Sequence, residues 1–397
     1  MPAPILPTEV WRSILRDATH VPFLLEAEWN WDPDAYIWTG WDSPSMGPTI
    51  VDVEVPNAEA TKQAIIRVCR QWWALGAEFL YEAVTLPDDA PQIDKFIETI
   101  RQSQSSSTIG YGWWIKRIQW APHGRGSYFE NVSILLNHCP NLKILLVKRW
   151  AAIGYKDQVL LAQLLQSVVS ASLKRLDFIV DFREDDGSVQ INNVLPNFHL
   201  HSLSLTIGEP NLLEPLSLDF GAISTLVLVV QRLTAALPNW SFPNLRSLSV
   251  FHFEEDEIPS LVSLVERHRQ TLKCLHLHPL GPQCDTNTLL SVAPNLISLS
   301  TTHGHFRWFA TVTDGGLSRQ YPSITHIGIY RSPSSRYIPP SRDAMEHMME
   351  RRMFPGLKII RLTCGTAADD ISAWEELGVL FQRYGVRLED MYNRHLC

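Results

Sequence analysis

The chain has 397 residues, of which 45% are hydrophobic and 19% are charged, and its formal net charge is −8. This length and composition can bury a sizeable core, and no basic cluster is dense enough to follow a phosphate backbone, so we expect no nucleic-acid partner. No apolar run is long enough to cross a bilayer, and the first residues lack the basic and apolar regions of a signal peptide. We therefore expect a protein of the cytoplasm or the nucleus, with no membrane partner.

Two amphipathic helices are predicted before residue 87. The first begins near Thr8, which can cap it, and its apolar positions are Val10, Trp11, Ile14 and Leu15. The second is predicted over Ala60–Tyr81. Residues 20–60 form an acidic insert rich in tryptophan and proline. We expect the insert to be an irregular surface loop, with a short strand at Ile50–Val55.

From residue 87 onward, a phrase of the form Leu-x-x-Leu-x-Leu returns roughly every 22 to 33 residues. Its clearest copies follow a Pro-Asn step, at Pro140, Pro243 and Pro294, and weaker copies follow Pro322 and Pro355. Because proline stops a helix, each step is expected to end one helix and lead into a strand. Helices are predicted over Tyr128–Asn137, Leu160–Val169, Ile258–His268 and Ala367–Arg383, and a last short strand at Val386–Leu388. The pattern predicts an α/β solenoid of leucine-rich character with a parallel sheet, an architecture that more often binds partners than catalyses a reaction.

Alternate residues of a strand face opposite sides of the sheet. The first, fourth and sixth residues of each unit should therefore point inward, as with Leu142, Leu145, Val147, Leu245, Leu248, Val250, Leu272, Leu275 and Leu277. The outward positions combine aromatic, histidine and arginine side chains, which are typical of recognition surfaces. We expect a target-binding patch at Phe251, His276, His278, Thr302, His326, Tyr330 and Arg361. The alternative is that these are ordinary solvent-facing strand residues.

The N-terminal region resembles a known interaction domain. Leu6-Pro7-x-Glu9-Val10 with Ile14-Leu15, followed by Val68-Cys69-Arg70-x-Trp72, is similar to the F-box. The next segment, Leu80–Leu86, looks like the strand by which such domains run into a leucine-rich solenoid. With the repeats, nearly the whole chain resembles the F-box/leucine-rich-repeat proteins. The resemblance implies an F-box-like domain over residues 1–86, split by the insert at 20–60, and a leucine-rich horseshoe over 87–397 with a capping helix at its C-terminal end.

In that family the F-box docks onto the Skp adaptor of a cullin–RING ubiquitin ligase, and the repeats hold the protein to be ubiquitinated. The resemblance therefore implies a substrate receptor with an unknown protein target. By matching position, the adaptor-binding residues would be Leu6, Pro7, Val10, Ile14, Leu15, Val68, Cys69 and Trp72. The insert departs from the family, where the two helical parts lie close together. In the alternative, the chain is a leucine-rich scaffold and its F-box remnant is only a structural cap.

The sequence contains none of the motifs that mark a catalytic serine elbow, a phosphate-binding loop or a His-Glu-x-x-His zinc helix. The pairs His276/His278 and His303/His305 each share a strand face, but no acid or cysteine stands at ligand spacing. We therefore expect no catalytic residue, no metal and no cofactor. A metal-dependent hydrolase that uses the histidines is the enzymatic rival. His326 beside His276 and His278 could instead make recognition sensitive to pH.

Overall fold

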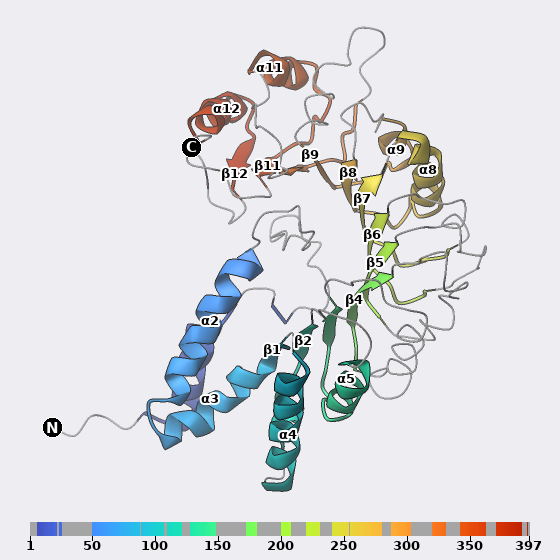
Figure 1. Ribbon diagram of the computed structural model, residues 1–397. Helices are drawn as coiled ribbons and strands as arrows, with labels where there is room; N and C mark the ends of the chain where they lie inside the picture. The colour runs from blue at the N-terminus through green and yellow to red at the C-terminus, as the bar shows by residue number, and fades with distance from the viewer. Residues whose placement is uncertain are drawn as a thin grey trace, which may run out of the picture. The chain divides into compact units, whose positions relative to one another are not determined.

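The computed structural model describes residues 6–21, 24–25, 50–87, 89–106, 109–120, 128–147, 172–180, 200–207, 220–230, 240–253, 255–279, 287–302, 320–330, 342–362, 371–390 and 395. These residues form two compact units (Figure 1). The described residues up to His201 make the first unit, and those from Ser202 onward make the second. The boundary between the units lies among the repeats that the sequence predicts.

The first unit begins with three helices and continues with strands, some of which are separated by further helices. Figure 1 shows them in blue and green. In chain order its elements are α1 (Thr8–Thr19), α2 (Ile50–Ile66), α3 (Arg70–Glu82), β1 (Ala83–Thr85), α4 (Ala90–Ser106), η1 (Tyr111–Trp114), β2 (Arg117–Trp120), α5 (Tyr128–Asn137), β3 (Ile144–Val147) and β4 (Arg175–Val180).

The second unit begins with three strands, has helices between several of the later strands, and ends on a helix and a short strand. Its elements are β5 (Ser202–Ile207), β6 (Thr225–Val230), β7 (Ser247–Phe253), η5 (Glu255–Glu257), α8 (Ile258–Arg267), β8 (Cys274–Pro279), α9 (Asn287–Val292), β9 (Ser298–Thr302), β10 (His326–Tyr330), α11 (Arg342–Glu350), β11 (Ile359–Leu362), α12 (Ile371–Arg383) and β12 (Arg387–Glu389). The predicted closing helix is therefore present as α12, and the predicted last strand as β12.

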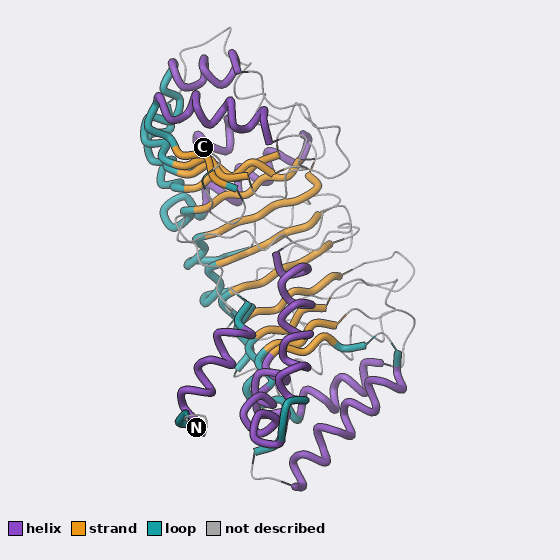
Figure 2. Tube along the Cα trace, turned by 90° about the vertical axis from the view of Figure 1, so that its left-hand side faces the viewer, coloured by secondary structure: helices purple, strands orange, loops and turns teal. Residues whose placement is uncertain are grey.

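The strands form one open sheet of 12 strands that follow one another in sequence order. The strand pairs described within each unit are parallel, and Figure 2 shows the strands lying side by side. Parallel neighbours need a crossover between them, which the intervening segments supply. The predicted α/β class, with its parallel sheet, is confirmed.

The leucines of the repeated phrase fill the interior. Leu142, Leu145, Leu245, Leu248, Leu272 and Leu275 are all buried, and so are Val147, Val250 and Leu277 further along the same strands. Their equal spacing in each strand places one layer of apolar side chains on the next. Fully burying one such side chain stabilises the fold by about 1.5–3 kcal/mol. The prediction that these positions point inward is confirmed.

The residue after each repeated proline ties its turn to the turn of the preceding repeat. In each case a side-chain donor reaches a backbone carbonyl some two dozen residues earlier in the chain. The bonds run from Asn141 Nδ2 to Trp113 O (2.8 Å), Asn244 Nδ2 to Gly221 O (2.6 Å), Asn295 Nδ2 to Arg269 O (3.3 Å) and Ser323 Oγ to Pro294 O (2.9 Å). At the fifth copy, Gly356 has no side chain, and a Cβ there would lie 2.4 Å from Pro322 O. The proline step therefore does more than end a helix, because the residue after it links neighbouring turns.

Two expectations for the N-terminal region are wrong. The single helix predicted over Ala60–Tyr81 is two helices, α2 and α3, separated at residues 67–69. Cys69 ends the continuity because its Sγ accepts a hydrogen bond from Trp72 N–H (3.5 Å) and so caps a new helix. The strand predicted at Ile50–Val55 is the first part of α2. Its β-branched residues favour a strand, but tertiary context overrides such a preference.

The strand predicted within Leu80–Leu86 is shorter than that segment, since residues 80–82 complete α3 and only Ala83–Thr85 form β1. Of the three other predicted helices of the repeats, Tyr128–Asn137 matches α5, Ile258–His268 matches α8, and Leu160–Val169 lies outside the described residues. In the part of the chain that the structure describes, no helix combines the length and the apolar character needed to span a membrane.

Candidate functional site

Helix α1 is fixed to the first unit through one side only. Leu15 is 2% exposed and forms an apolar cluster with Ile65 of α2 and with Leu75 and Phe79 of α3. Trp11 and Trp72 pack against this cluster, with their ring centroids 5.1 Å apart. The three helices therefore share one small core.

Polar contacts align α1 along α3. Arg12 Nε lies 3.1 Å from Glu78 Oε1, and the guanidinium of Arg16 stands over the ring of Phe79, 5.6 Å from its centroid. Exposed ion pairs of this kind contribute at most about 1 kcal/mol, so they orient the helix more than they stabilise it.

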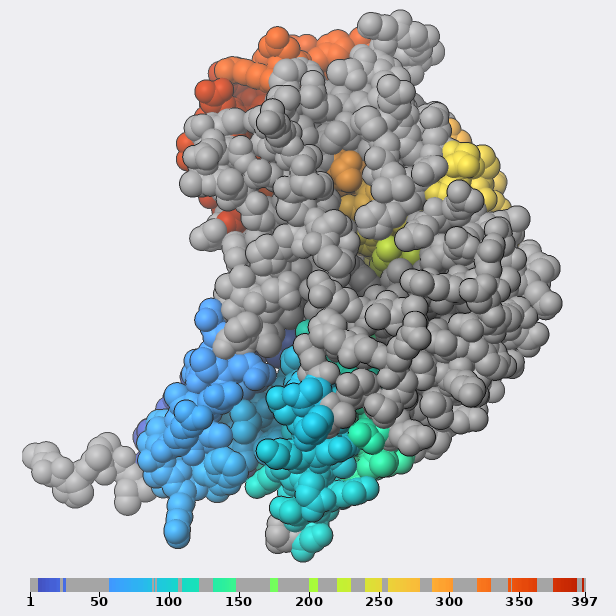
Figure 3. Space-filling view, in the orientation of Figure 1, coloured from blue at the N-terminus to red at the C-terminus, as the bar shows by residue number. Residues whose placement is uncertain are grey.

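The opposite side of α1 leaves apolar residues exposed. Val10 is 41% exposed and Ile14 is 43% exposed, one turn further along, and Pro7 is exposed one turn before Val10. Residues three and four apart lie on one face of a helix, so these three form a continuous strip, which we call the α1 apolar face. Val68, in the turn between α2 and α3, is 60% exposed. Figure 3 shows α2 and α4 of this unit at the molecular surface, in blue and cyan.

The structure divides the predicted adaptor-binding residues into two groups. Pro7, Val10, Ile14, Val68 and Cys69 are exposed. Leu15 faces the core, so the expectation that it faces a partner is wrong: its position on the helix, next to Trp11, turns it toward α2 and α3. Leu6 and Trp72 are half-buried, and Trp72 is a core-packing residue.

The predicted target-binding patch lies on one face of the second unit, but it is not exposed. By register, His276 of β8 stands between Ser249 of β7 and Ser300 of β9. His276 is 1% exposed, and Phe251, His278, His326 and Arg361 are also buried. The expectation that these positions face solvent is wrong, because this parallel sheet is buried on both faces.

Individual contacts show how these residues are held. The rings of Phe251 and His278 are stacked, with centroids 4.3 Å apart. Burial lowers the pKa of His276 to about 4, so its imidazole is neutral at pH 7. Thr302 is half-buried at the end of β9, and Tyr330 ends β10 with a side chain outside the described residues.

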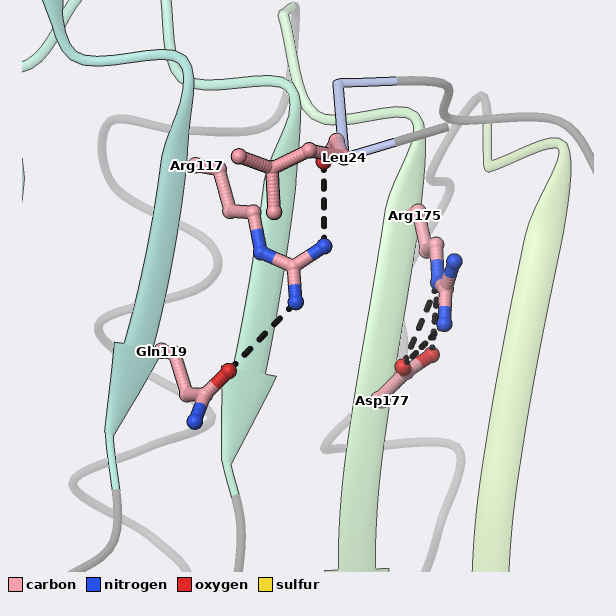
Figure 4. A network of polar contacts seen from close by, with 5 residues as sticks. All are labelled: Leu24, Arg117, Gln119, Arg175 and Asp177. Atoms are coloured by element: carbon pink, nitrogen blue, oxygen red, sulfur yellow. Dashed lines mark hydrogen bonds and ion pairs between the residues drawn. The ribbon is translucent and has the colours of Figure 1, made fainter. Parts of the chain in front are cut away.

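Two arginines on the sheet, Arg361 and Arg175, are paired with carboxylates. Arg361 Nη2 lies 2.7 Å from Glu389 Oε2, and both side chains are buried. In the first unit, Arg175 Nη2 lies 2.7 Å from Asp177 Oδ2, two residues along the same strand (Figure 4). Buried charges of opposite sign that neutralise each other leave little free charge for a ligand.

Sequence reasoning missed a third arginine on the sheet. Arg117 of β2 is buried, and its Nη1 donates to Leu24 O (3.0 Å) while its Nη2 donates to Gln119 Oε1 (3.4 Å) (Figure 4). Leu24 itself is buried in a cluster with Val21, Ala58 and Ala83. Arg117 thereby ties the segment after α1 to the sheet. The sequence signal that could have revealed Arg117 is its alternation with Gln119 in a strand whose other residues are apolar.

Within the described ranges, no three His, Cys, Asp or Glu side chains gather as metal ligands. His303 and His305, one of the two pairs considered, lie outside those ranges.

No family model matches the chain, and no curated protein matches it. Among solved structures, a crystal structure of a protein from Bacteroides fragilis, a target of the Northeast Structural Genomics Consortium, is similar with a TM-score of 0.37 and 13% sequence identity. The similarity covers 77% of this chain and 82% of that protein.

Proposed function

We propose that this protein is the substrate-recognition subunit of a cullin–RING ubiquitin ligase, which binds a Skp-type adaptor through α1 to α3 and holds a target protein through its repeats. The observation that carries the proposal is the α1 apolar face. Pro7, Val10 and Ile14 belong to the segment that resembles an F-box, and they are exposed on a helix whose other side is packed. Burying these apolar side chains against a partner would remove them from water and so stabilise the complex.

The arrangement of the helices supports the same role. In an F-box/leucine-rich-repeat protein the adaptor-binding helices run directly into the repeats, and here α3 is followed at once by β1. The proline-linked turns and the inward leucines are the features expected of leucine-rich repeats. The proposed protein contributes no catalytic group. It would act by holding the target close to a ubiquitin-conjugating enzyme, and proximity alone gives large rate gains.

The target-binding half of the proposal needs a different surface from the one first expected. Phe251, His276 and His278 are covered, so a target would contact them only after a rearrangement of the second unit. Thr302 is the member of the patch that is partly accessible among those whose side chains are described.

A second candidate function is a repeat scaffold in which α1 to α3 serve only as a cap. The contacts between α3 and the first repeats favour it: Lys116 N–H donates to Glu82 O (3.0 Å), and the rings of Tyr81 and Tyr111 are stacked with centroids 4.5 Å apart. A cap shields the first repeat from solvent, which is a sufficient reason for these contacts.

An exposed-face variant separates the two functions. Val10→Glu with Ile14→Glu adds charge to the α1 apolar face without touching the core, because both side chains are exposed. We expect the double variant to keep its thermal unfolding midpoint and to lose co-purification with a co-expressed Skp adaptor. The matched control is Val379→Glu, which charges an exposed valine of α12. Equal adaptor recovery with the double variant and the control would exclude this face as the contact and favour the scaffold.

A further inference from the structure

The residue immediately before each strand occupies the same place in every repeat, and its backbone is hydrogen-bonded to its counterparts. In the first unit, Lys143 N–H donates to Lys116 O and Lys174 N–H donates to Lys143 O, each at 2.8 Å. Lys116, Lys143 and Lys174 therefore stand side by side where β2, β3 and β4 begin. We call these three residues the lysine strip.

The lysine strip concentrates positive charge in a chain whose net charge is −8. Neighbouring strands are about 4.8 Å apart, and like charges on adjacent strands repel each other. An ion pair with Glu82, the residue at the same place before β1, balances the charge of Lys116. Among the described residues, no carboxylate lies within ion-pair distance of Lys143 or Lys174. Lys143 is exposed and Lys174 is half-buried.

The fold does not require a cation at this place. In the second unit the corresponding residues before β6, β9 and β10 are Ser224, Ile297 and Thr325, whereas those before β7, β8 and β11 are Arg246, Lys273 and Lys358. Their backbones make the same bonds, as when Thr325 N–H donates to Ile297 O at 2.9 Å. The consecutive lysines of the first unit therefore carry an electrostatic cost that the architecture does not explain.

We propose that the lysine strip is a docking surface for an acidic segment of a partner protein. Three strands span about 10 Å, which is the length of about three extended residues, so a short run of aspartate and glutamate matches the strip. Carboxylates placed against Lys143 and Lys174 would remove the repulsion between them. None of the three lysines belongs to α1, α2 or α3, the helices of the proposed adaptor contact.

The charge balance favours an acidic protein segment over a nucleic acid. DNA-binding proteins commonly make about 6 to 10 phosphate contacts, and this strip offers two cations, Lys143 and Lys174, that lack a carboxylate partner among the described residues. The negative net charge of the chain would also repel a long polyanion. A short acidic segment meets the strip without extending far over the rest of the surface.

The test is a binding titration with fluorescein-labelled octaglutamate, followed by anisotropy at low salt, about 50 mM NaCl. We expect wild type to bind and Lys143→Gln with Lys174→Gln to bind about tenfold more weakly, since each exposed pair contributes up to about 1 kcal/mol. Lys143→Arg with Lys174→Arg should retain binding, and binding should weaken at about 500 mM NaCl, where exposed charges are screened.

The matched control is Lys95→Gln with Lys358→Gln, which removes the same charge elsewhere. Lys95 is exposed on α4, and Lys358 holds the corresponding place before β11 between the uncharged Thr325 and Val386. The proposal fails if the control loses as much affinity as the Lys143/Lys174 variant, or if wild type does not bind octaglutamate at low salt. Tighter binding of a labelled single-stranded octanucleotide than of octaglutamate would also overturn it, in favour of nucleic acid.

Discussion

Burial determines the chemistry of single side chains in the second unit. The pKa of His276 is lowered to about 4 from the ordinary value of 6.5, and burial is the cause. The imidazole of His268 behaves similarly, with its pKa lowered to about 4 by burial and, to a smaller extent, by Arg267. Arg361 is paired with the buried Glu389. Removing Arg361 would leave this carboxylate without its closest cation. The first role of these residues is therefore in the folded state, and any role in binding a partner comes second.

The lowered pKa of His276 predicts that the second unit loses stability in mild acid. Below pH 6.5 the unfolded state takes up a proton that the folded state excludes down to about pH 4, so stability is full above pH 6.5 and falls as the pH drops toward 4. Between pH 7 and pH 5 the loss is on the order of 2 kcal/mol from this residue. Urea unfolding at several pH values measures it.

The variant that checks the assignment is His276→Gln, which cannot take up a proton. We expect its free energy of unfolding to depend less on pH than that of wild type. A wild-type curve that is flat between pH 7 and pH 5 would contradict the prediction.

Among the elements, the turns that precede the strands link one repeat to the next. Four of them use a side-chain donor, and at Gly356 the backbone itself approaches the preceding turn. The position matters because these turns set the spacing at which the next strand enters the sheet. A glycine there reflects close approach and not flexibility.

Gly356→Ala should therefore destabilise the protein by about 1–3 kcal/mol, the usual cost of overpacking. The new Cβ would lie 2.4 Å from Pro322 O, a backbone atom that cannot easily move away. Gly221→Ala is the control, because a Cβ at Gly221 meets nothing within 4 Å, and its effect should stay within about 0.5 kcal/mol. Similar unfolding midpoints for the two variants in urea would refute the close contact.

Local sequence predicted some elements well and others poorly. The inward leucines and helices α5, α8 and α12 follow from short-range periodicity, which the sequence displays directly. The break between α2 and α3 depends on a cap at Cys69, and periodicity runs through it without interruption. The β-branched residues of Ile50–Val55 favour a strand. Their helical conformation at the start of α2 depends on tertiary contacts, which the local sequence does not display.

At the scale of the whole molecule, the sequence predicts the fold class of the open sheet of 12 parallel strands. It does not predict which positions of the sheet are exposed. Which face of a sheet is covered depends on segments distant in sequence, as when Arg117 bonds to Leu24, 93 residues away. The lysine strip could not be predicted from local sequence for a similar reason. Its members are isolated along the chain, and they become neighbours only when each occupies the same place before its strand.

The two proposed surfaces give the first unit more of the protein's recognition chemistry than the sequence suggested. The α1 apolar face is hydrophobic and the lysine strip is cationic, so they suit partners of different chemistry. In the second unit, where recognition was expected, the patch residues Phe251, His276, His278, His326 and Arg361 are buried.

The most direct test of the proposed function is a titration of purified Skp adaptor into the purified protein, followed by calorimetry and by size-exclusion chromatography. The proposed function predicts a saturable one-to-one complex that wild type forms and that Val10→Glu with Ile14→Glu does not. A well-folded wild-type protein that shows no binding heat and elutes apart from the adaptor would contradict it, and would leave α1 to α3 as the cap of a repeat scaffold.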